Sequence, residues 1–433
     1  MVKKKRKFED TNIEDNEKYR VKRATMIGLL VVFVVAVYFL IVYNRLLIAY
    51  IKDRYRFFSL INNLPGVSFR ECIVELCKFS ADGVEWSYQV EALYRRFAYR
   101  HEHGILRFWL GPYPLVFLCR AKSARVIYDS PTQIDKPKLY DAFGMLSPKG
   151  PLASNGDDWR LARKITLSAF FSDALFEYIN VFNKNCRKLI NNLDGFCESG
   201  ETFDIHPILT NYTISTIIET AMGVSTEQKY TEFVAYNEAL QRALKYMFLR
   251  IRNPLLWNST FNWLVGHDEK IKKYCEVCKS LSRKVLQERR QYWEENGGIK
   301  PVDEMTKAEK KRLPFIDVLL SMEDKYQLTE EMILSQIDGI IAAGSDSMSN
   351  QIGFNLYLLG HRQQYQDKVY HEIRKVLGNS DRDITYADMD NLKYLWQNIC
   401  ETGRIIPNVV LQARKLSEDT EICKFAFSDC FIC

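Results

Sequence analysis

Polar residues interrupt the middle of one long apolar segment. The stretch LTEEMILSQIDGIIAAGSDSMSNQIGFNLYLLGH has no proline before His361 and opens with Thr329 as a candidate N-cap, which predicts a single long helix. Its centre holds Gly344, Asp346 and Ser347, where an ordinary core helix would be apolar. Carboxyl and hydroxyl groups can exchange protons, and local violations of this kind are expected at functional sites. A kink that faces solvent is the alternative.

A candidate ion pair lies in the segment YLWQNICETGRIIP. Glu401 and Arg404 are three residues apart, so they would share one face of a helix and could pair. The residues around the pair are apolar, which leads us to expect a buried, structural ion pair; they are Leu395, Trp396, Ile399, Ile405 and Ile406. A lone salt bridge at the surface is the alternative that spacing alone favours.

The cysteines raise a question of their own. Cys423, Cys430 and Cys433 all fall near the end of the sequence, where we expect either a metal-binding thiolate or the end of a protein whose metal-binding part is missing. Cys275 and Cys278 form a C-x-x-C, but no second pair or His cluster accompanies it, so we interpret both as packing residues. The total of 11 cysteines is odd and scattered, which indicates reduced thiols on a cytosolic face and no disulfide framework.

Composition narrows the class of protein. The 433 residues are 47% hydrophobic and 13% aromatic, which is typical of a globular body. The 60 basic and 54 acidic residues give a net charge of +6, and no basic run accompanies a reading motif. We therefore expect no nucleic-acid partner.

The amino-terminal part predicts a membrane anchor. Residues 24–43, ATMIGLLVVFVVAVYFLIVY, run without a charge over a length that can cross a bilayer as a helix. The alternatives are a buried core helix and a cleaved signal peptide, which the length and the lack of a small-residue cleavage site disfavour. Around the anchor we expect a basic extension at residues 1–23 and a linker at residues 44–66, which ends in the stiff turn of NNLPGV.

The body is predicted to be mainly α-helical with small β-sheets. ILRFWLGPYPLVFLC reads as a β-hairpin from Ile105 to Cys119. SDALFEYINVFNKNCRKLINNL has apolar residues three and four apart, which predicts a helix with one core stripe, made of Leu175, Ile179, Phe182 and Leu189. Residues 297–314 are polar and Lys-rich, which indicates a solvated loop.

Several short motifs occur together in one order. GDDWRLARK contains W-x-x-x-R at Trp159 and Arg163, and AAGSDS, ETGR and QARKLSED follow it along the chain. With FDIHP, IIETAMG and KRLPFIDVLL, they resemble the haem-thiolate monooxygenases, the cytochrome P-450 family, in its membrane-anchored microsomal type and its insect-like family-4 branch of fatty-acyl ω-hydroxylases. The resemblance implies the cytochrome P-450 fold, preceded by one transmembrane helix, with a catalytic domain over residues 67–422 and a divergent tail at residues 423–433.

The resemblance implies a haem cofactor and the residues that hold it. Haem carries two propionates, and the family's matching residues indicate that Arg163, Arg414 and the indole N–H of Trp159 bind them. The family's iron ligand is a Cys in a Phe-x-x-Gly-x-Arg-x-Cys-x-Gly loop. Nothing in the sequence matches that loop, because FAFSDC has neither its Gly nor its Arg. We therefore expect none of the three terminal cysteines to bind iron, and no other metal site.

The same resemblance gives the long helix its chemistry. Gly344 would let this helix approach the haem face, and Asp346 and Ser347 would pass protons toward iron-bound oxygen. The family usually has Thr where Ser347 stands. Family-4 proteins often carry, at the position of Ala343, a Glu that bonds covalently to haem, so we expect no such linkage here.

Two hypotheses of function follow. The first is a haem-dependent monooxygenase that inserts one atom of O2 into a small apolar substrate, which could be fatty-acyl, hormone-like or a xenobiotic. Its electrons would come from NADPH-dependent cytochrome P-450 reductase. The second is a non-catalytic, truncated, membrane-anchored remnant that lacks the haem thiolate.

The expected location is the membrane of the endoplasmic reticulum, crossed once, with the body on the cytosolic face. Basic residues are more frequent before the anchor than after it, which by the positive-inside rule predicts the opposite orientation. A start at Met26 would remove the conflict, because the chain would then open with MIGLLVVFVV.

Overall fold

The computed structural model describes residues 32–35, 37–38, 42–52, 54–80, 82–99, 101–110, 113–170, 172–227, 230–306, 309, 313–418, 420–422, 425–427 and 431–432. The expected basic extension and the cysteines at 423, 430 and 433 lie outside these ranges. No helix among the described residues is both long and apolar enough to cross a membrane. Residues 24–31, 36 and 39–41 of the expected anchor also lie outside the described ranges.

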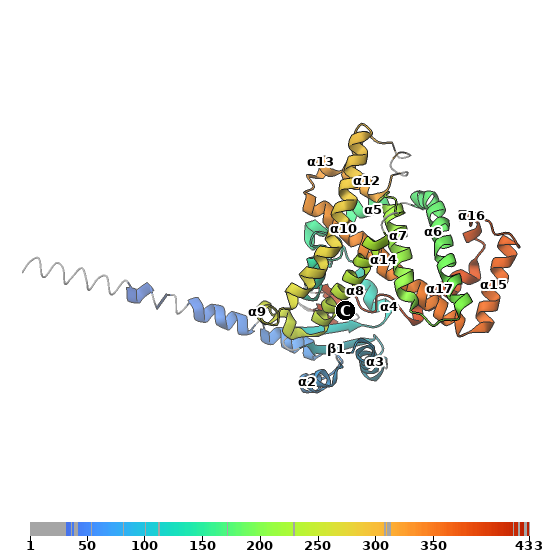
Figure 1. Cartoon of the computed structure of the whole chain (residues 1–433). Helices are drawn as coiled ribbons and strands as arrows, with labels where there is room; N and C mark the ends of the chain where they lie inside the picture. The colour runs from blue at the N-terminus through green and yellow to red at the C-terminus, as the bar shows by residue number, and fades with distance from the viewer. Residues whose placement is uncertain are drawn as a thin grey trace, which may run out of the picture.

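Helices make up most of the described body (Figure 1). The α-helices are α2 (Phe69–Lys78), α3 (Gly83–Leu93), α4 (Ala121–Tyr128), α5 (Gly156–Ala169), α6 (Ser172–Ser199), α7 (Ile205–Ala221), α8 (Tyr230–Arg252), α9 (Ser259–Leu264), α10 (His267–Glu295), α12 (Phe315–Ser321), α13 (Glu323–Tyr326), α14 (Glu330–Gly360), α15 (Gln363–Leu377), α16 (Tyr386–Met389) and α17 (Lys393–Ile405). Short 3-10 helices are η2 (Lys138–Met145), η3 (Pro254–Trp257) and η4 (Val302–Glu304), and η1 (Tyr94–Ala98) is a π-helix. The chain is therefore mainly α, as its sequence predicts.

A small sheet joins two ends of the sequence. The predicted hairpin is confirmed as β1 (Ile105–Leu110) paired antiparallel with β2 (Tyr113–Leu118). Two strands from the carboxyl-terminal part extend it in the order β1-β2-β6-β3, where β3 is Arg414–Lys415 and β6 is Phe431–Ile432. β6 runs parallel to β2 and antiparallel to β3. A separate antiparallel pair joins β4 (Thr420–Ile422) to β5 (Phe425–Phe427).

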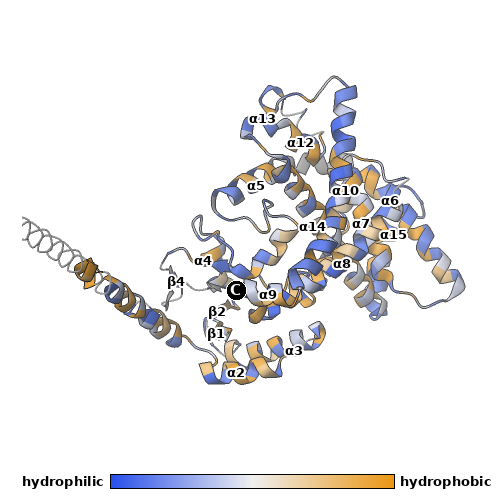
Figure 2. Cartoon of the chain, turned by 60° about the vertical axis from the view of Figure 1, so that its left-hand side comes forward, coloured by the Kyte–Doolittle hydropathy of each residue, from blue (hydrophilic) through white to orange (hydrophobic). Residues whose placement is uncertain are grey.

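The core has a large helical part and a smaller part around the hairpin. The helical part is formed by buried apolar residues of α7, α8, α10, α12 and α14. Figure 2 shows α10 as largely hydrophilic, whereas α7 and α14 are more hydrophobic. An amphipathic helix covers a core with one face, and a helix that is apolar on most sides lies inside it. α7 and α14 thus form the centre of the body, and α10 covers them.

The turn before α2 is anchored to β1 by a buried arginine. Arg107 lies on β1, and its guanidinium donates to the carbonyl oxygens of Ile61, Asn62 and Val67 at 3.3, 2.5 and 3.1 Å. Gly66 has φ +151°, and a Cβ placed there would lie 2.3 Å from the carbonyl oxygen of Arg107. Only glycine fits this close approach, which explains the glycine in the predicted NNLPGV turn.

The expectation of a buried Glu401–Arg404 pair is wrong. Both side chains lie on α17 and form a bidentate pair, with Nε–Oε2 and Nη2–Oε1 distances of 2.7 and 2.6 Å. The side chains are 53% exposed for Glu401 and 70% for Arg404. The helix turns a different face to α14, because Thr402 is the residue that is buried there, bonded through its hydroxyl to Asn355. The apolar residues next to the pair in sequence did not reveal which face of α17 would be covered by α14.

Candidate functional site

α14 carries the polar residues predicted for the long helix. The hydroxyl oxygen of Thr329 accepts from the backbone N–H of Met332 at 3.3 Å, so the predicted N-cap is confirmed. From there the helix runs without a break to Gly360, through Gly344. At its centre Gly344 faces Ile217 of α7 and not solvent.

Gly344 lies against α7. A Cβ added at this position would lie 3.0 Å from Cδ1 of Ile217, a residue of α7. A contact of that length requires the neighbour to move, so the glycine permits α7 and α14 to pack closely.

Asp346 and Ser347 point to different partners. The carboxylate of Asp346 accepts from Nε2 of Gln241 on α8 at 2.9 Å and from Nδ2 of Asn350 at 3.4 Å. The hydroxyl of Ser347 donates to the carbonyl oxygen of Ala343 at 2.7 Å. Gln241 was not among the residues predicted for the site, and a single polar residue inside a helix gives no sequence signal of such a contact.

α5 carries the two predicted residues of the W-x-x-x-R motif. Trp159 and Arg163 are four residues apart, so they lie one turn from each other on the same face. Arg163 is exposed, and no acidic side chain of the described residues pairs with it. The exposed Arg160 on the same helix does have an acidic partner, Asp157, at 2.9 Å. Arg163 is therefore the arginine of α5 that is available to an anionic ligand.

A buried lysine joins Trp159 to the region of Arg414. Lys136 is 8% exposed, its Nζ lies 5.4 Å from the centre of the Trp159 ring, and it donates to the carbonyl oxygen of Ser154 at 2.7 Å. Burial is the main cause that lowers the pKa of Lys136 to about 8; the nearby guanidinium of Arg414 adds to this lowering, and the carboxylate of Asp135 opposes it. The effect of Arg414 shows that a second cation lies near Lys136 at this junction, beside the single carboxylate of Asp135.

Arg414 sits at the start of β3, next to the segment that carries Lys136. Its Nη1 donates to the carbonyl oxygen of Ala413 at 2.9 Å, and the backbone N–H of Lys415 donates to the carbonyl oxygen of Asp135 at 2.8 Å. The structure thus brings Arg414 and Trp159, which are far apart in sequence, to one place through Lys136. Sequence reasoning missed Lys136, since an isolated lysine before a proline carries no motif.

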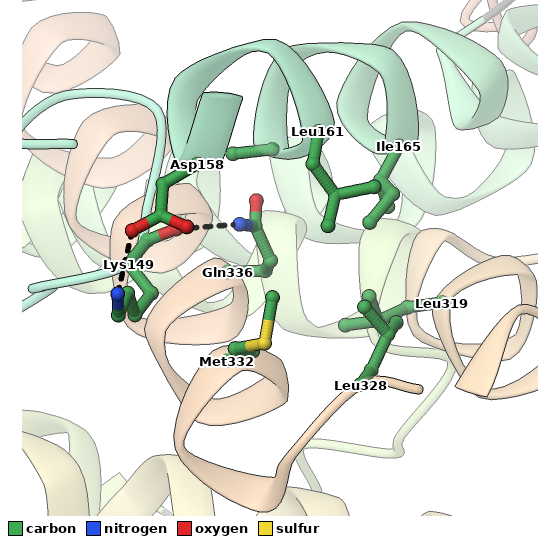
Figure 3. Close-up of a pocket in the computed structure, with 9 residues that line it drawn as sticks. Lys149, Asp158, Leu161, Ile165, Leu319, Leu328, Met332 and Gln336 are labelled. Carbon is green, nitrogen blue, oxygen red and sulfur yellow. Dashed lines mark hydrogen bonds and ion pairs between the residues drawn. The ribbon is translucent and has the colours of Figure 1, made fainter. Parts of the chain in front are cut away.

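A separate small pocket lies between α5, α12 and α14 (Figure 3). Its walls are mostly apolar, and Lys149 and Asp158 close one side with an ion pair at 2.5 Å. Nε2 of Gln336 on α14 donates to the carbonyl oxygen of Lys149 at 3.0 Å, as the dashed line in Figure 3 shows. These contacts hold the loop before α5 on α14, and none of the predicted site residues lines the pocket.

The predicted packing role of the C-x-x-C is confirmed. Cys275 and Cys278 are buried on α10 and are free thiols. Burial raises the pKa of Cys275 to about 12 and that of Cys278 higher still, so neither is a thiolate at neutral pH. Within the described ranges, no group of three or more His, Cys, Asp or Glu side chains is arranged to hold a metal ion.

Comparison with known proteins gives one consistent family. The family model described as Cytochrome P450 matches residues 86–428. The chain belongs to the cytochrome P450 family. A crystal structure of a cytochrome P450 (CYP102L1) shares the fold with a TM-score of 0.63 and 19% sequence identity, over 80% of this chain and 77% of that one.

Curated relatives place the chain near family 4 of the cytochromes P450. Cytochrome P450 4V2 of Homo sapiens is 32% identical over 330 residues, which are 76% of this chain and 62% of that protein. Cytochrome P450 4c21 of Blattella germanica is 29% identical over 319 residues, 73% of this chain and 64% of the relative. The chain thus spans less than two thirds of the length of these relatives.

Family membership implies a haem cofactor, and the junction of α5 with β3 fits its polar edge. Haem propionates are carboxylates, which need cationic and N–H donors. The buried Lys136 lies close to a second cation, Arg414, and to one carboxylate, Asp135, so the two cations exceed the negative charge beside them and an added anion is favoured. Trp159 and Arg163 lie on the adjoining helix. The residues at this edge therefore match the group that the family implies.

Proposed function

We propose that this protein is a haem-dependent monooxygenase that inserts one oxygen atom of O2 into an apolar substrate. The observation that carries the proposal is the meeting of Lys136, Trp159 and Arg414 from three separate segments at one cationic edge. Family membership over residues 86–428 supports it independently.

At the polar edge, the role of this chain is to hold the cofactor. Arg163, Arg414 and Lys136 would pair with its two carboxylates, and Trp159 would donate its indole N–H. An arginine offers two parallel N–H groups to a carboxylate, which fixes orientation as well as position. When bound, the haem supplies the iron at which O2 is reduced and its O–O bond broken.

On α14, Ser347 and Asp346 would supply protons to the reacting oxygen. The Ser347 hydroxyl is bonded to the carbonyl of Ala343, so it can pass a proton outward only by rotating away from that carbonyl. The Asp346 carboxylate is held by Gln241 and would exchange protons with solvent through α8. Ala343 has no carboxyl group, so the covalent linkage to haem often seen in family 4 is not part of the proposal.

The partners and the location follow from the family. We propose NADPH-dependent cytochrome P-450 reductase as the electron donor, and a fatty-acyl, hormone-like or xenobiotic molecule as the substrate. The proposed location is the cytosolic face of the endoplasmic reticulum membrane, held by residues 24–43. Protection of the body from protease in intact microsomes would contradict this orientation.

A second candidate is a non-catalytic protein that lacks the iron thiolate. Its support is limited to the residues present, in which FAFSDC has the Phe of Phe-x-x-Gly-x-Arg-x-Cys-x-Gly but neither its Gly nor its Arg. A thiolate ligand pushes electron density toward the iron and favours O–O cleavage, and this candidate would lack that electron donation.

A carbon monoxide difference spectrum separates the two candidates. The purified chain of 433 residues is titrated with haem, reduced, and exposed to carbon monoxide. A thiolate-type Soret band supports the monooxygenase. Saturable haem binding without that band supports the second candidate and would overturn the proposed chemistry.

The same titration tests the cationic edge. We expect Arg163→Ala to weaken haem binding at least tenfold, because it removes a charged partner of a propionate, a contact worth about 1.5–3 kcal/mol. The matched control is Arg160→Ala on the same helix, since Arg160 is committed to Asp157. If both variants bind haem as the parent chain does, the α5 edge is not the propionate site.

A further inference from the structure

α7 runs along the part of α14 that carries the proposed proton-supplying residues. A Cβ added at Gly344 would meet Ile217 at 3.0 Å, and one added at Gly353 would meet Leu209 at 3.3 Å. As the residue number rises along α7 it falls along α14, so the two helices are antiparallel. The two helices lie side by side in both overviews (Figures 1 and 2).

One face of α7 makes these contacts. Leu209, Thr213 and Ile217 are spaced by four residues and therefore share one face of the helix. The facing residues of α14 are small, which allows the two backbones to approach; they are Gly344, Ser345, Ser349 and Gly353. Ser345 and Ser349 are fully buried.

Thr213 is the polar member of this face, and it bonds across to α14. Its hydroxyl oxygen lies 2.9 Å from the carbonyl oxygen of Ser345 and 3.0 Å from that of Thr210 on its own helix. Thr213 is 5% exposed, so water does not compete for the bond. A hydroxyl has one hydrogen, and both carbonyls lie in its reach.

The other threonines of α7 use their hydroxyls differently. Thr210, Thr216 and Thr220 each donate to the carbonyl four residues back in α7, at 2.9, 2.8 and 2.6 Å. This is the usual bond of a hydroxyl inside a helix. Among the hydrogen bonds of the described residues, Thr213 is the one threonine of these four whose hydroxyl bonds to another helix. Its acceptor, the carbonyl of Ser345, lies between Gly344 and Asp346 in the sequence.

The turn of α14 around Ser345 contains residues that weaken a helix. Gly344 is a poor helix former, and Ser345 and Ser347 both bond back to carbonyls one turn earlier, a pattern that loosens or bends helices. The Asp346 carboxylate is held from α8 and the Ser347 hydroxyl by Ala343. The backbone just before Asp346, at the carbonyl of Ser345, is held from α7 by Thr213.

We propose that Thr213 is a positioning residue, which fixes the turn of α14 that carries Gly344, Asp346 and Ser347. It acts through the backbone carbonyl of Ser345 and touches neither substrate nor cofactor. The consequence for chemistry rests on the proposed function, because only in that case do Asp346 and Ser347 deliver protons. The effect of Thr213 on the stability of this turn of α14 does not depend on the proposed function.

The test compares three variants of the 433-residue chain by amide hydrogen exchange. Thr213→Val keeps the shape and removes the donor, and Thr213→Ser keeps the donor. Thr220→Val is the matched control, since Thr220 is also buried and donates within α7. We expect Thr213→Val to speed exchange of the amides of residues 345–351 about fivefold, the effect of losing one buried hydrogen bond.

The outcomes are separable. Faster exchange in Thr213→Val, with parent-like exchange in Thr213→Ser and Thr220→Val, supports the proposal. Equal exchange at residues 345–351 in Thr213→Val and Thr220→Val overturns it. Where haem binding and turnover are obtained, Thr213→Val should also release a several-fold larger share of reduced O2 as peroxide, and Thr213→Ser should not. A chain that never forms a thiolate-type spectrum contradicts the proposed function and leaves the exchange result to decide the role of Thr213.

Discussion

At the scale of single residues, Asp338 has a carboxyl group that is almost completely buried. It lies on α14, is 2% exposed, and burial raises its pKa from the ordinary 3.8 to about 7. Lys279 and Arg283 on α10 act to lower this pKa, and burial outweighs them. The folded chain therefore holds the Asp338 proton at a pH where the unfolded chain has released it.

The sign of the resulting pH dependence follows from linkage. A raised carboxyl pKa contributes fully to stability below about pH 4, and that contribution is lost as the pH rises to about 7. Between pH 5 and 8 the loss amounts to roughly 3 kcal/mol, at 1.36 kcal/mol for each pKa unit. We expect Asp338→Asn to remove this loss, and hence to be the more stable protein at pH 8.

Urea unfolding of the parent chain, Asp338→Asn and the control Asp390→Asn at pH 5 and pH 8 measures the effect. Asp390 is exposed beyond α16, so its substitution should leave the pH dependence as it is in the parent. Identical slopes of stability against pH in all three proteins would show that Asp338 does not titrate between these values.

At the scale of elements, two ion pairs of similar geometry differ in their exposure to solvent: one is buried and the other is exposed. Arg289 of α10 donates from Nε to Asp317 of α12 at 2.6 Å, and Trp293 donates to the same oxygen at 2.9 Å. The Asp317 side chain is fully buried, whereas Glu401 and Arg404 on α17 are exposed. A buried charge left without its partner has no water to replace it.

We expect Asp317→Ala to lower the free energy of unfolding by about 3–5 kcal/mol, because it strands the guanidinium of Arg289. Glu401→Ala should leave stability within the error of measurement, since solvent replaces the lost partner. Thermal and urea unfolding of both variants would check this. A larger loss in Glu401→Ala than in Asp317→Ala would mean that solvent does not reach the α17 pair.

The elements also show how far the sequence could lead. Periodicity and turn residues sufficed for the hairpin at β1–β2 and for α14 with its Thr329 cap, because these signals are local. The position of Lys136 beside Trp159 and that of Gln241 beside Asp346 depend on contacts between distant segments. The prediction that Glu401 is buried failed for the same reason. Its sequence neighbours are apolar, but the packing of α14 decides which face of α17 is buried.

At the scale of the whole molecule, the two larger core clusters of the described residues are built from different parts of the sequence. One lies among α7, α8, α10, α12 and α14. The other joins residues 57–67 to β1, β2, Leu416, which follows β3, and Ile422 of β4. Separate cores can open separately, in cooperative units smaller than the whole chain. The turn at Gly66, where residues 61–67 meet β1, belongs to the second core alone.

This separation predicts a local effect for Gly66→Ala. The substitution forces a side chain into φ +151° and against the backbone of Arg107, which costs about 1–3 kcal/mol from the backbone alone. The hydrogen bonds between Arg107 and residues 61–67 should then weaken, and amide exchange should rise in β1 and α2 while α7 and α14 stay protected. Gly360→Ala is the control, because a Cβ there meets nothing within 4 Å. Equal loss of protection in α14 and β1 would show that both cores unfold as one unit.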